Sequence, residues 1–151
     1  ISADGSYLSP GDYSVGTTGG ADAPKFSAQI TIPAMPVLTS PAPDAPKPTL
    51  VTRSNGLTVT WTGGQANQIV QLEGFNTTDI TYTVGADFLC SVPASAGTFT
   101  IPPDVLMPMP AGSLGGLLFR PLVTPVGVTG TGLNVAFVDA AYQWFAPLNF
   151  N

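Results

Sequence analysis

The fold is decided by residues 57–62, which read Leu57-Thr58-Val59-Thr60-Trp61-Thr62. Successive side chains of a strand point to opposite faces, so three apolar side chains share one face and three threonines share the other. One apolar and one polar face is typical of an antiparallel strand that covers a core on one side. We therefore predict a half-buried strand here, with Trp61 in the core and Gly63-Gly64 ending the strand.

Short apolar stretches of this kind recur along the chain, and 17 Gly and 16 Pro residues interrupt them. Stretches of such length suit strands rather than helices. One helical turn is expected at residues 102–108, where prolines and Asp104 begin the segment. About seven or eight short strands in roughly a hundred residues are typical of two packed sheets, so the predicted fold is an all-β, antiparallel two-sheet β-sandwich. The further predicted strands are residues 69–72, 81–84, 88–92, 98–101, 116–119, 133–138 and 142–145.

The first part of the chain is predicted to be a β-hairpin. Residues 12–15 and 26–32 alternate in polarity and are joined by the Gly-rich and Thr-rich residues 16–22. Phe26, Ala28, Ile30 and Ile32 would share its apolar face. We expect the segment 1–32 to pack against a sheet, either its own or that of a neighbour.

A proline-rich stretch follows the hairpin, with six prolines in residues 33–48. Proline fixes an extended backbone and removes a hydrogen-bond donor. Two interpretations stay open, a linker between modules and a segment that only covers a sheet edge. The predicted organisation is an N-terminal hairpin at 1–33, a linker at 34–48 and a β-sandwich domain at 49–151.

Charged residues make up only 9% of the chain, and 44% is hydrophobic. The four cations are scattered and the net charge is -5, so we expect no nucleic-acid partner. The apolar runs are too short or too interrupted to cross a bilayer, so we also expect no membrane span. Two usual causes of so low a charge content are a membrane span and a protein surface that other protein covers. With the first not expected, the second is our hypothesis.

The sequence offers little for catalysis. It contains no His, which removes histidine-dependent hydrolysis and His-metal sites. Glu73 is the sole Glu, and we expect it at a solvated strand end before a turn at Gly74, with a general-acid role as the alternative. The lone Cys90 alternates with Phe88 and Val92, which predicts a core thiol. We therefore predict that the protein is not an enzyme and has no cofactor, catalytic residue or metal site.

Two other motifs are weaker. The sequon at Asn76-Thr77-Thr78 is expected to be only a turn. Tyr142, Trp144 and Phe150 form the candidate ligand or partner face, because exposed aromatic rings can stack on sugars. Core packing or contact with another subunit is the alternative for these three residues.

Six segments matter for the family of the chain. They read YLSPGDY at 7–13, GGAD at 19–22, FSAQITIP at 26–33, LTVTWTGG at 57–64, GADFLCSVPASAGTFTIP at 85–102 and VL at 105–106. Together they resemble a recurring part of large secreted proteins predicted in acidobacteria and similar soil bacteria. The resemblance implies an immunoglobulin-like or similar β-sandwich of uncharacterised function, exported and held outside the cell, with no catalytic residues. It also implies that the hairpin at 1–33 is the end of an upstream module. The chain departs from that pattern after Leu114, where it becomes richer in Phe, Trp and Pro.

These observations predict a non-catalytic extracellular structural module, a subunit or repeat of a surface assembly, fibre or adhesin. Its expected partners are copies of itself or neighbouring modules, joined by strand addition, which needs no charged side chains. The alternative is a carbohydrate-binding module of a secreted protein, which would use Tyr142, Trp144 or Tyr82. Assembly that depends on concentration would favour the first, and retention on a polysaccharide without assembly would favour the second.

Overall fold

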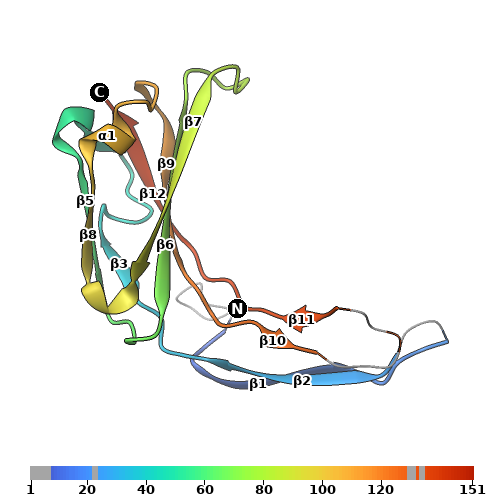
Figure 1. Ribbon diagram of the computed structural model, residues 1–151. Coiled ribbons are helices and arrows are strands. Elements are labelled where there is room, and N and C mark those ends of the chain that lie inside the picture. Colours follow the sequence, from blue (N-terminus) through green and yellow to red (C-terminus); the bar gives the residue numbers. More distant parts are fainter. Residues whose placement is uncertain (1–7, 22–23, 129–131, 133–134) are drawn as a thin grey trace. The chain divides into compact units, whose positions relative to one another are not determined.

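The computed structural model describes residues 8–21, 24–128, 132 and 135–151. The protein is all-β, built from several sheets, with one short α-helix in the described part (Figure 1). It divides into two compact units. Unit 1 comprises the described residues within 1–35 and 123–141, and unit 2 comprises 36–122 and 142–151.

Unit 2 contains two sheets. The five-stranded sheet has the order β4-β12-β9-β6-β7, and the three-stranded sheet has the order β3-β5-β8. Their bounds are β3 Val37–Ser40, β4 Thr49–Val51, β5 Leu57–Thr62, β6 Ile69–Thr77, β7 Gly85–Pro93, β8 Thr98–Ile101, β9 Gly112–Pro121 and β12 Trp144–Phe150. Short helices lie at Arg53–Asn55 (η1), Ala94–Ala96 (η2) and Pro103–Leu106 (α1).

One neighbouring pair departs from the expected antiparallel pattern. β12 runs antiparallel to β9 but parallel to β4, with Leu148 opposite Thr49. Parallel neighbours need a long crossover connection. Here all the other strands of unit 2 except β3 lie between β4 and β12 in the sequence. Neither strand contains a sequence pattern that predicts its pairing with the other.

Side chains from both sheets meet in one core. The rings of Trp61 on β5 and Phe119 on β9 have centroids 5.6 Å apart, and Phe119 contacts Trp144 on β12 edge to face at 5.8 Å. The prediction for residues 57–62 is confirmed, because Leu57, Val59 and Trp61 are buried. Burial of these apolar side chains is the main favourable contribution to the stability of unit 2.

Most of the predicted strands are present, and several are longer than expected. Residues 69–72, 88–92, 98–101 and 116–119 lie within β6, β7, β8 and β9, and the predicted helical turn contains α1, where Leu106 is buried. The strand predicted at 81–84 is wrong, because these residues form a loop whose polar groups bond to Asp79. The last predicted strand begins only at Trp144 and continues to Phe150.

Unit 1 contains the predicted hairpin, which is confirmed. β1 (Gly11–Thr17) pairs antiparallel with β2 (Phe26–Ile32), and Tyr13 lies opposite Ile30. Ile30 and Ile32 are buried, as the alternation predicts. A second pair of two-residue strands, β10 (Val126–Gly127) and β11 (Phe137–Val138), covers part of the strand predicted at 133–138, of which Leu133 and Asn134 lie outside the described residues.

From Pro36 onward, the proline-rich segment is part of unit 2. Within the expected linker 34–48, β3 pairs with β5, and the backbone N–H of Asp44 donates to the carbonyl oxygen of Phe145 at 2.9 Å. Thr39 and Thr60 add a hydroxyl contact of 2.9 Å across the same strands. Residues 123–141, expected in the domain at 49–151, lie in unit 1.

Candidate functional site

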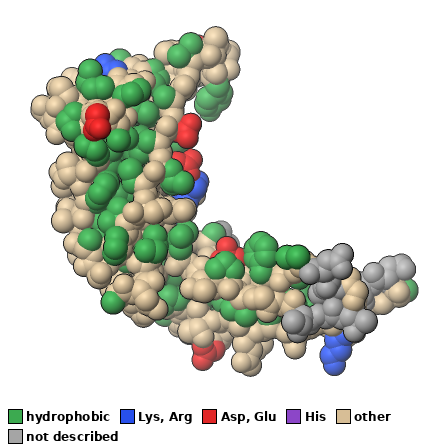
Figure 2. Space-filling view, viewed as in Figure 1, with side chains coloured by type: hydrophobic (Ala, Val, Ile, Leu, Met, Phe, Trp, Pro, Cys, Tyr) green, Lys and Arg blue, Asp and Glu red, His purple; other side chains and the backbone are tan. Residues whose placement is uncertain are grey.

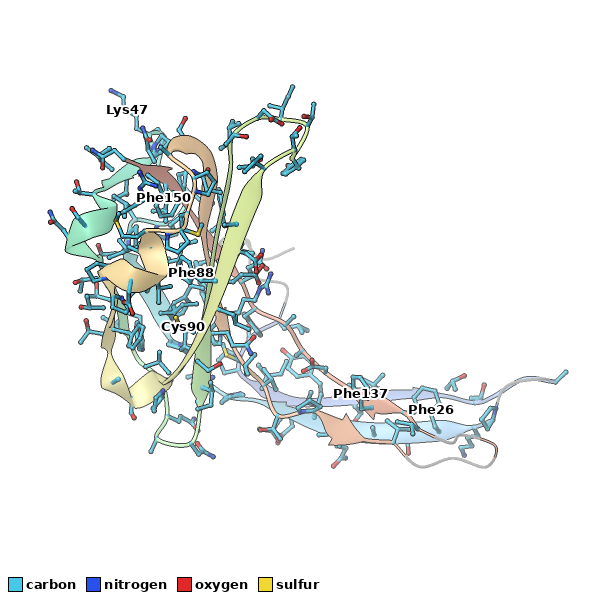
Figure 3. The ribbon with its side chains drawn as sticks, turned by 45° about the horizontal axis from the view of Figure 1, so that its top comes forward. Phe26, Lys47, Phe88, Cys90, Phe137 and Phe150 are labelled. Atoms are coloured by element: carbon cyan, nitrogen blue, oxygen red, sulfur yellow. The ribbon has the colours of Figure 1, made fainter. Side chains whose placement is uncertain are left out.

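The three aromatic residues named as a candidate ligand or partner face do not form one exposed surface. Alternation along β12 directs Trp144, Ala146, Leu148 and Phe150 toward the core, and Phe150 is only 1% exposed. Figure 3 shows Phe150 in the interior of unit 2 with Phe88 and Cys90. Trp144 is half-buried against Phe119, and Tyr142 is half-buried just before the strand. Phe150 is therefore a core residue, which matches the alternative of core packing.

A different aromatic pair lies on the outward face of the five-stranded sheet. The rings of Phe75 on β6 and Phe145 on β12 have centroids 6.3 Å apart and planes inclined by only 24°. β9 runs between these two strands, and Gly116 of β9 lies directly opposite Phe75. A Cβ atom on Gly116 would lie 2.1 Å from the Phe145 ring, so the ring occupies the space that a side chain would fill.

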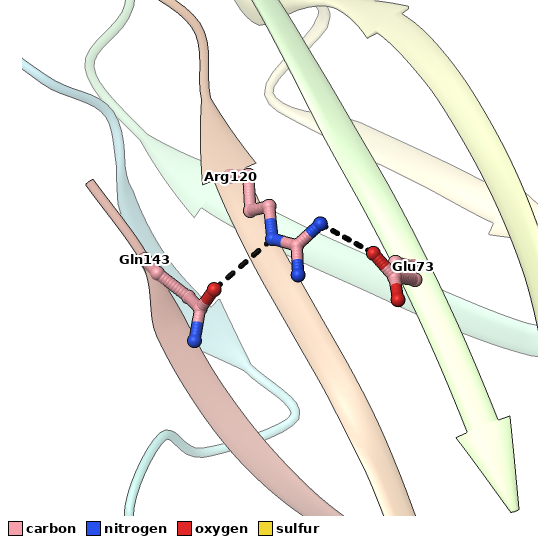
Figure 4. A network of polar contacts seen from close by, with 3 residues as sticks. All are labelled: Glu73, Arg120 and Gln143. Atoms are coloured by element: carbon pink, nitrogen blue, oxygen red, sulfur yellow. Dashed lines mark hydrogen bonds and ion pairs between the residues drawn. The ribbon is translucent and has the colours of Figure 1, made fainter. Parts of the chain in front are cut away.

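Charged and amide groups adjoin this pair (Figure 4). The Arg120 guanidinium forms an ion pair through Nη1 with Glu73 Oε2, and its Nε donates to Gln143 Oε1 at 3.0 Å. The side chains of Arg120 and Glu73 are 34% and 29% exposed, so solvent screens the pair and its contribution to stability is small. Glu73 and Arg120 lie on the neighbouring strands β6 and β9, and Gln143 lies just before β12. We call these three residues, with Phe75 and Phe145, the outer-face cluster.

The structure corrects the expectation for Glu73. Glu73 lies in the middle of β6, and Gly74 continues the strand instead of starting a turn. The reason is visible on the core side, where a Cβ on Gly74 would lie 2.1 Å from the ring of Phe88. Glycine inside a strand often marks such a close approach.

The sequon is not a turn either. Asn76 and Thr77 end β6 and are buried. Asn76 Nδ2 donates to the carbonyl oxygens of Pro110 at 2.8 Å and Gly112 at 3.2 Å, while its Oδ1 has no partner among the described residues. The Asn76 side chain therefore links the end of β6 to the start of β9 and to Pro110 just before it.

The edge of the five-stranded sheet at β7 is the longest free edge of unit 2. β7 has nine residues and pairs only with β6 in the described part of the chain. The other edge strands of unit 2 have three or four residues, and prolines adjoin them: Pro36 before β3, Pro48 before β4 and Pro102 after β8. Short edges and prolines are common protection against pairing with another chain. β7 lacks Lys and Arg and reaches a proline only at Pro93.

The loop between β6 and β7 is held by Asp79. Its carboxylate accepts from the hydroxyl and N–H of Thr81 at 2.5 and 2.8 Å, and from the N–H of Thr83 at 3.3 Å. These bonds, above all that from the Thr81 hydroxyl, lower the pKa of Asp79 to about 2. The loop exposes Ile80 and Tyr82, and Tyr82 has φ of 56°, which is uncommon for a bulky residue.

The described residues contain no group of three or more His, Cys, Asp or Glu side chains that could hold a metal ion. Cys90 is half-buried beside the core, and burial raises the pKa of its thiol. Such a thiol is a poor nucleophile, because the reactive form is the thiolate. Within the same part of the chain, no helix has the length and apolar character needed to cross a membrane.

Comparisons with family models, with curated proteins and with solved structures gave no match for this chain.

Proposed function

We propose that this chain is a non-catalytic structural module of an extracellular or cell-surface assembly, built on an immunoglobulin-like β-sandwich in unit 2. In this proposal it joins copies of itself or neighbouring modules by adding a strand to a sheet. The observation that carries the proposal is the nine-residue free edge of β7. An exposed edge of this length is a template for pairing, and folded proteins usually shorten or protect it.

The surface of the molecule supports this proposal. Figure 2 shows that charged side chains are few on the face in view. Leu89, on β7 itself, is 58% exposed. Main-chain hydrogen bonds supply affinity and exposed apolar side chains add buried area, so an interface of this kind needs no charges. The extracellular location rests on the sequence resemblance.

The experiment compares assembly of the natural chain with that of two variants at one position. Leu89→Pro removes a backbone donor and places a ring at the free edge, where proline is tolerated in a folded sheet. Leu89→Ser removes the same apolar side chain but keeps the N–H. Particle mass by light scattering and shape by negative-stain imaging should show assembly in the natural chain and in Leu89→Ser, and loss of assembly in Leu89→Pro. A natural chain that stays monomeric at high concentration would refute the proposal.

The outer-face cluster favours carbohydrate binding as a second candidate function. The nearly parallel rings of the exposed Phe145 and the half-buried Phe75 lie beside a guanidinium, a carboxylate and an amide. This arrangement resembles the combination of stacking and hydrogen bonding that sugars need. Affinity electrophoresis through soluble polysaccharides would test it with Phe145→Ala. Phe137→Ala is the matched control, because Phe137 is also exposed but lies in unit 1. Retardation that Phe145→Ala alone abolishes would support this candidate.

A further inference from the structure

We infer that the partner of the β7 edge is β7 of a second copy, paired antiparallel about a two-fold axis at Leu89. This inference rests on the proposed function, because it names the partner and the register of the same edge. Two observations carry it: the direction of the free backbone groups of β7, and the side chains that such a pairing brings together.

The hydrogen bonds at both ends of the β6–β7 pair determine which backbone groups are free. Thr78 N–H donates to Val84 O at 2.9 Å, and Ala94 N–H donates to Gln68 O at 2.8 Å. In an antiparallel ladder, hydrogen-bonded and non-hydrogen-bonded residue pairs alternate. The pairs Thr78 with Val84 and Gln68 with Ala94 both belong to the bonded set, so the residues of β7 bonded to β6 are the even-numbered ones.

The odd-numbered residues of β7 therefore direct their N–H and C=O groups away from β6, toward the free edge. These are Gly85, Asp87, Leu89, Ser91 and Pro93, of which only Pro93 lacks an N–H. Their side chains also point to the outward face, which is why Leu89 is exposed while Phe88 and Val92 are buried. A second strand can thus bond to this edge without any rearrangement of unit 2.

A two-fold axis at Leu89 is the register that suits the side chains. It places Leu89 opposite its own copy, Asp87 opposite Ser91 and Gly85 opposite Pro93. The exposed leucines then cover each other, and each carboxylate faces a hydroxyl that can donate to it. About eight main-chain hydrogen bonds form, because each Pro93 accepts but cannot donate.

Axes at three other residues of β7 give less favourable pairings of side chains or backbone groups. An axis at Asp87 places two carboxylates directly opposite, which is destabilising. An axis at Phe88 places each carboxylate opposite a leucine and brings the two carboxylates within roughly 7 Å, whereas the axis at Leu89 separates them by about 13 Å. An axis at Ser91 shortens the overlap and moves Pro93 opposite Leu89, where its missing donor leaves a carbonyl unpaired.

Cysteine crosslinking tests the register. In a Cys90→Ser background, Leu89→Cys places two thiols across the axis, where directly opposed Cα atoms lie about 5.5 Å apart, within reach of a disulfide. Ser91→Cys is the matched control on the same strand, because two copies of residue 91 would be about 13 Å apart. Mild oxidation should give a covalent dimer with Leu89→Cys and a monomer with Ser91→Cys on a non-reducing gel. Equal crosslinking of the two variants, or stronger crosslinking of Ser91→Cys, would overturn the register.

Amide exchange of the natural chain gives a second measurement that needs no substitution. At high protein concentration the N–H groups of Gly85, Asp87, Leu89 and Ser91 should become protected, and dilution should remove this protection. The even-numbered amides of β7 should stay protected at both concentrations. Alternating protection on assembly without crosslinking of Leu89→Cys would overturn the inference and leave the proposed function standing. Assembly without this alternating protection, or a chain that does not assemble, would overturn both.

Discussion

The indole Nε1 of Trp61 donates a buried hydrogen bond of 2.6 Å to the carbonyl oxygen of Ala94. Trp61 belongs to the three-stranded sheet, and Ala94 directly follows β7 of the five-stranded sheet. The Ala94 N–H is bonded to Gln68. Ala94, at the end of β7, is therefore bonded both to Gln68, just before β6, and to Trp61 in the opposite sheet.

Trp61→Phe should destabilise unit 2 by roughly 1–3 kcal/mol, because it leaves the Ala94 carbonyl buried without its donor. The matched control is Trp144→Phe, because the Trp144 side chain packs against Phe119 and makes no side-chain hydrogen bond among the described residues. Urea unfolding monitored by circular dichroism measures both. Equal losses for the two variants would show that the hydrogen bond adds nothing beyond ring volume.

Gly74→Ala should destabilise unit 2 by about 1–3 kcal/mol, because the new methyl group would collide with the buried ring of Phe88. A double-mutant cycle with Phe88→Leu isolates this collision. In the Phe88→Leu background, Gly74→Ala should lower the free energy of unfolding by clearly less. The same cost in both backgrounds would mean that the ring is not the reason for glycine at this position.

The Asp79 carboxyl should titrate at about pH 2, well below its ordinary value of 3.8. Because its pKa is lowered in the folded state, its stabilisation of the loop is complete above about pH 4 and is lost as the pH falls through 2. Carboxyl carbon shifts measured by NMR between pH 1.5 and 6 report the midpoint, and Asp79→Asn identifies the signal. A midpoint near 3.8 would contradict the bonds from Thr81 and Thr83.

Asn76→Asp should destabilise unit 2 by about 3 kcal/mol or more at pH 7, because a carboxylate would face the carbonyl oxygens of Pro110 and Gly112. Burial would raise the pKa of the new carboxyl, so the penalty should shrink at pH 4, where the protonated form can donate once. The control is Asn149→Asp, at a half-exposed position of β12. Its cost should stay within about 0.5 kcal/mol, and thermal unfolding at both pH values measures the difference.

Alternation of apolar and polar residues was sufficient to predict the strands that cover the core with one face. Residues 57–62 follow this rule, and so does the second strand of the hairpin, residues 26–32. The rule failed at residues 81–84, which form no strand because Thr81 and Thr83 bond to the side chain of Asp79 instead. It also failed at Gly74, because glycine is equally typical of turns and of strands under an aromatic ring, and only the position of Phe88 decides between them.

The outer-face cluster was not predictable from spacing. Phe75 and Phe145 are far apart in the sequence, and they meet only because β9 inserts between their strands. The available signal was the pair Gly115-Gly116 inside an apolar stretch, which indicates a strand that something approaches closely. The predicted face failed at Phe150 because the register of β12 directs even-numbered side chains inward.

The parallel pairing of β4 with β12 also orders events during translation. β12 lies between β4 and β9, yet it is the last strand of unit 2 to leave the ribosome. At synthesis rates of about 5–20 residues per second, β4 waits on the order of 10 s for its partner. The five-stranded sheet of the nascent chain therefore stays incomplete at an interior position until residues 144–150 have been made.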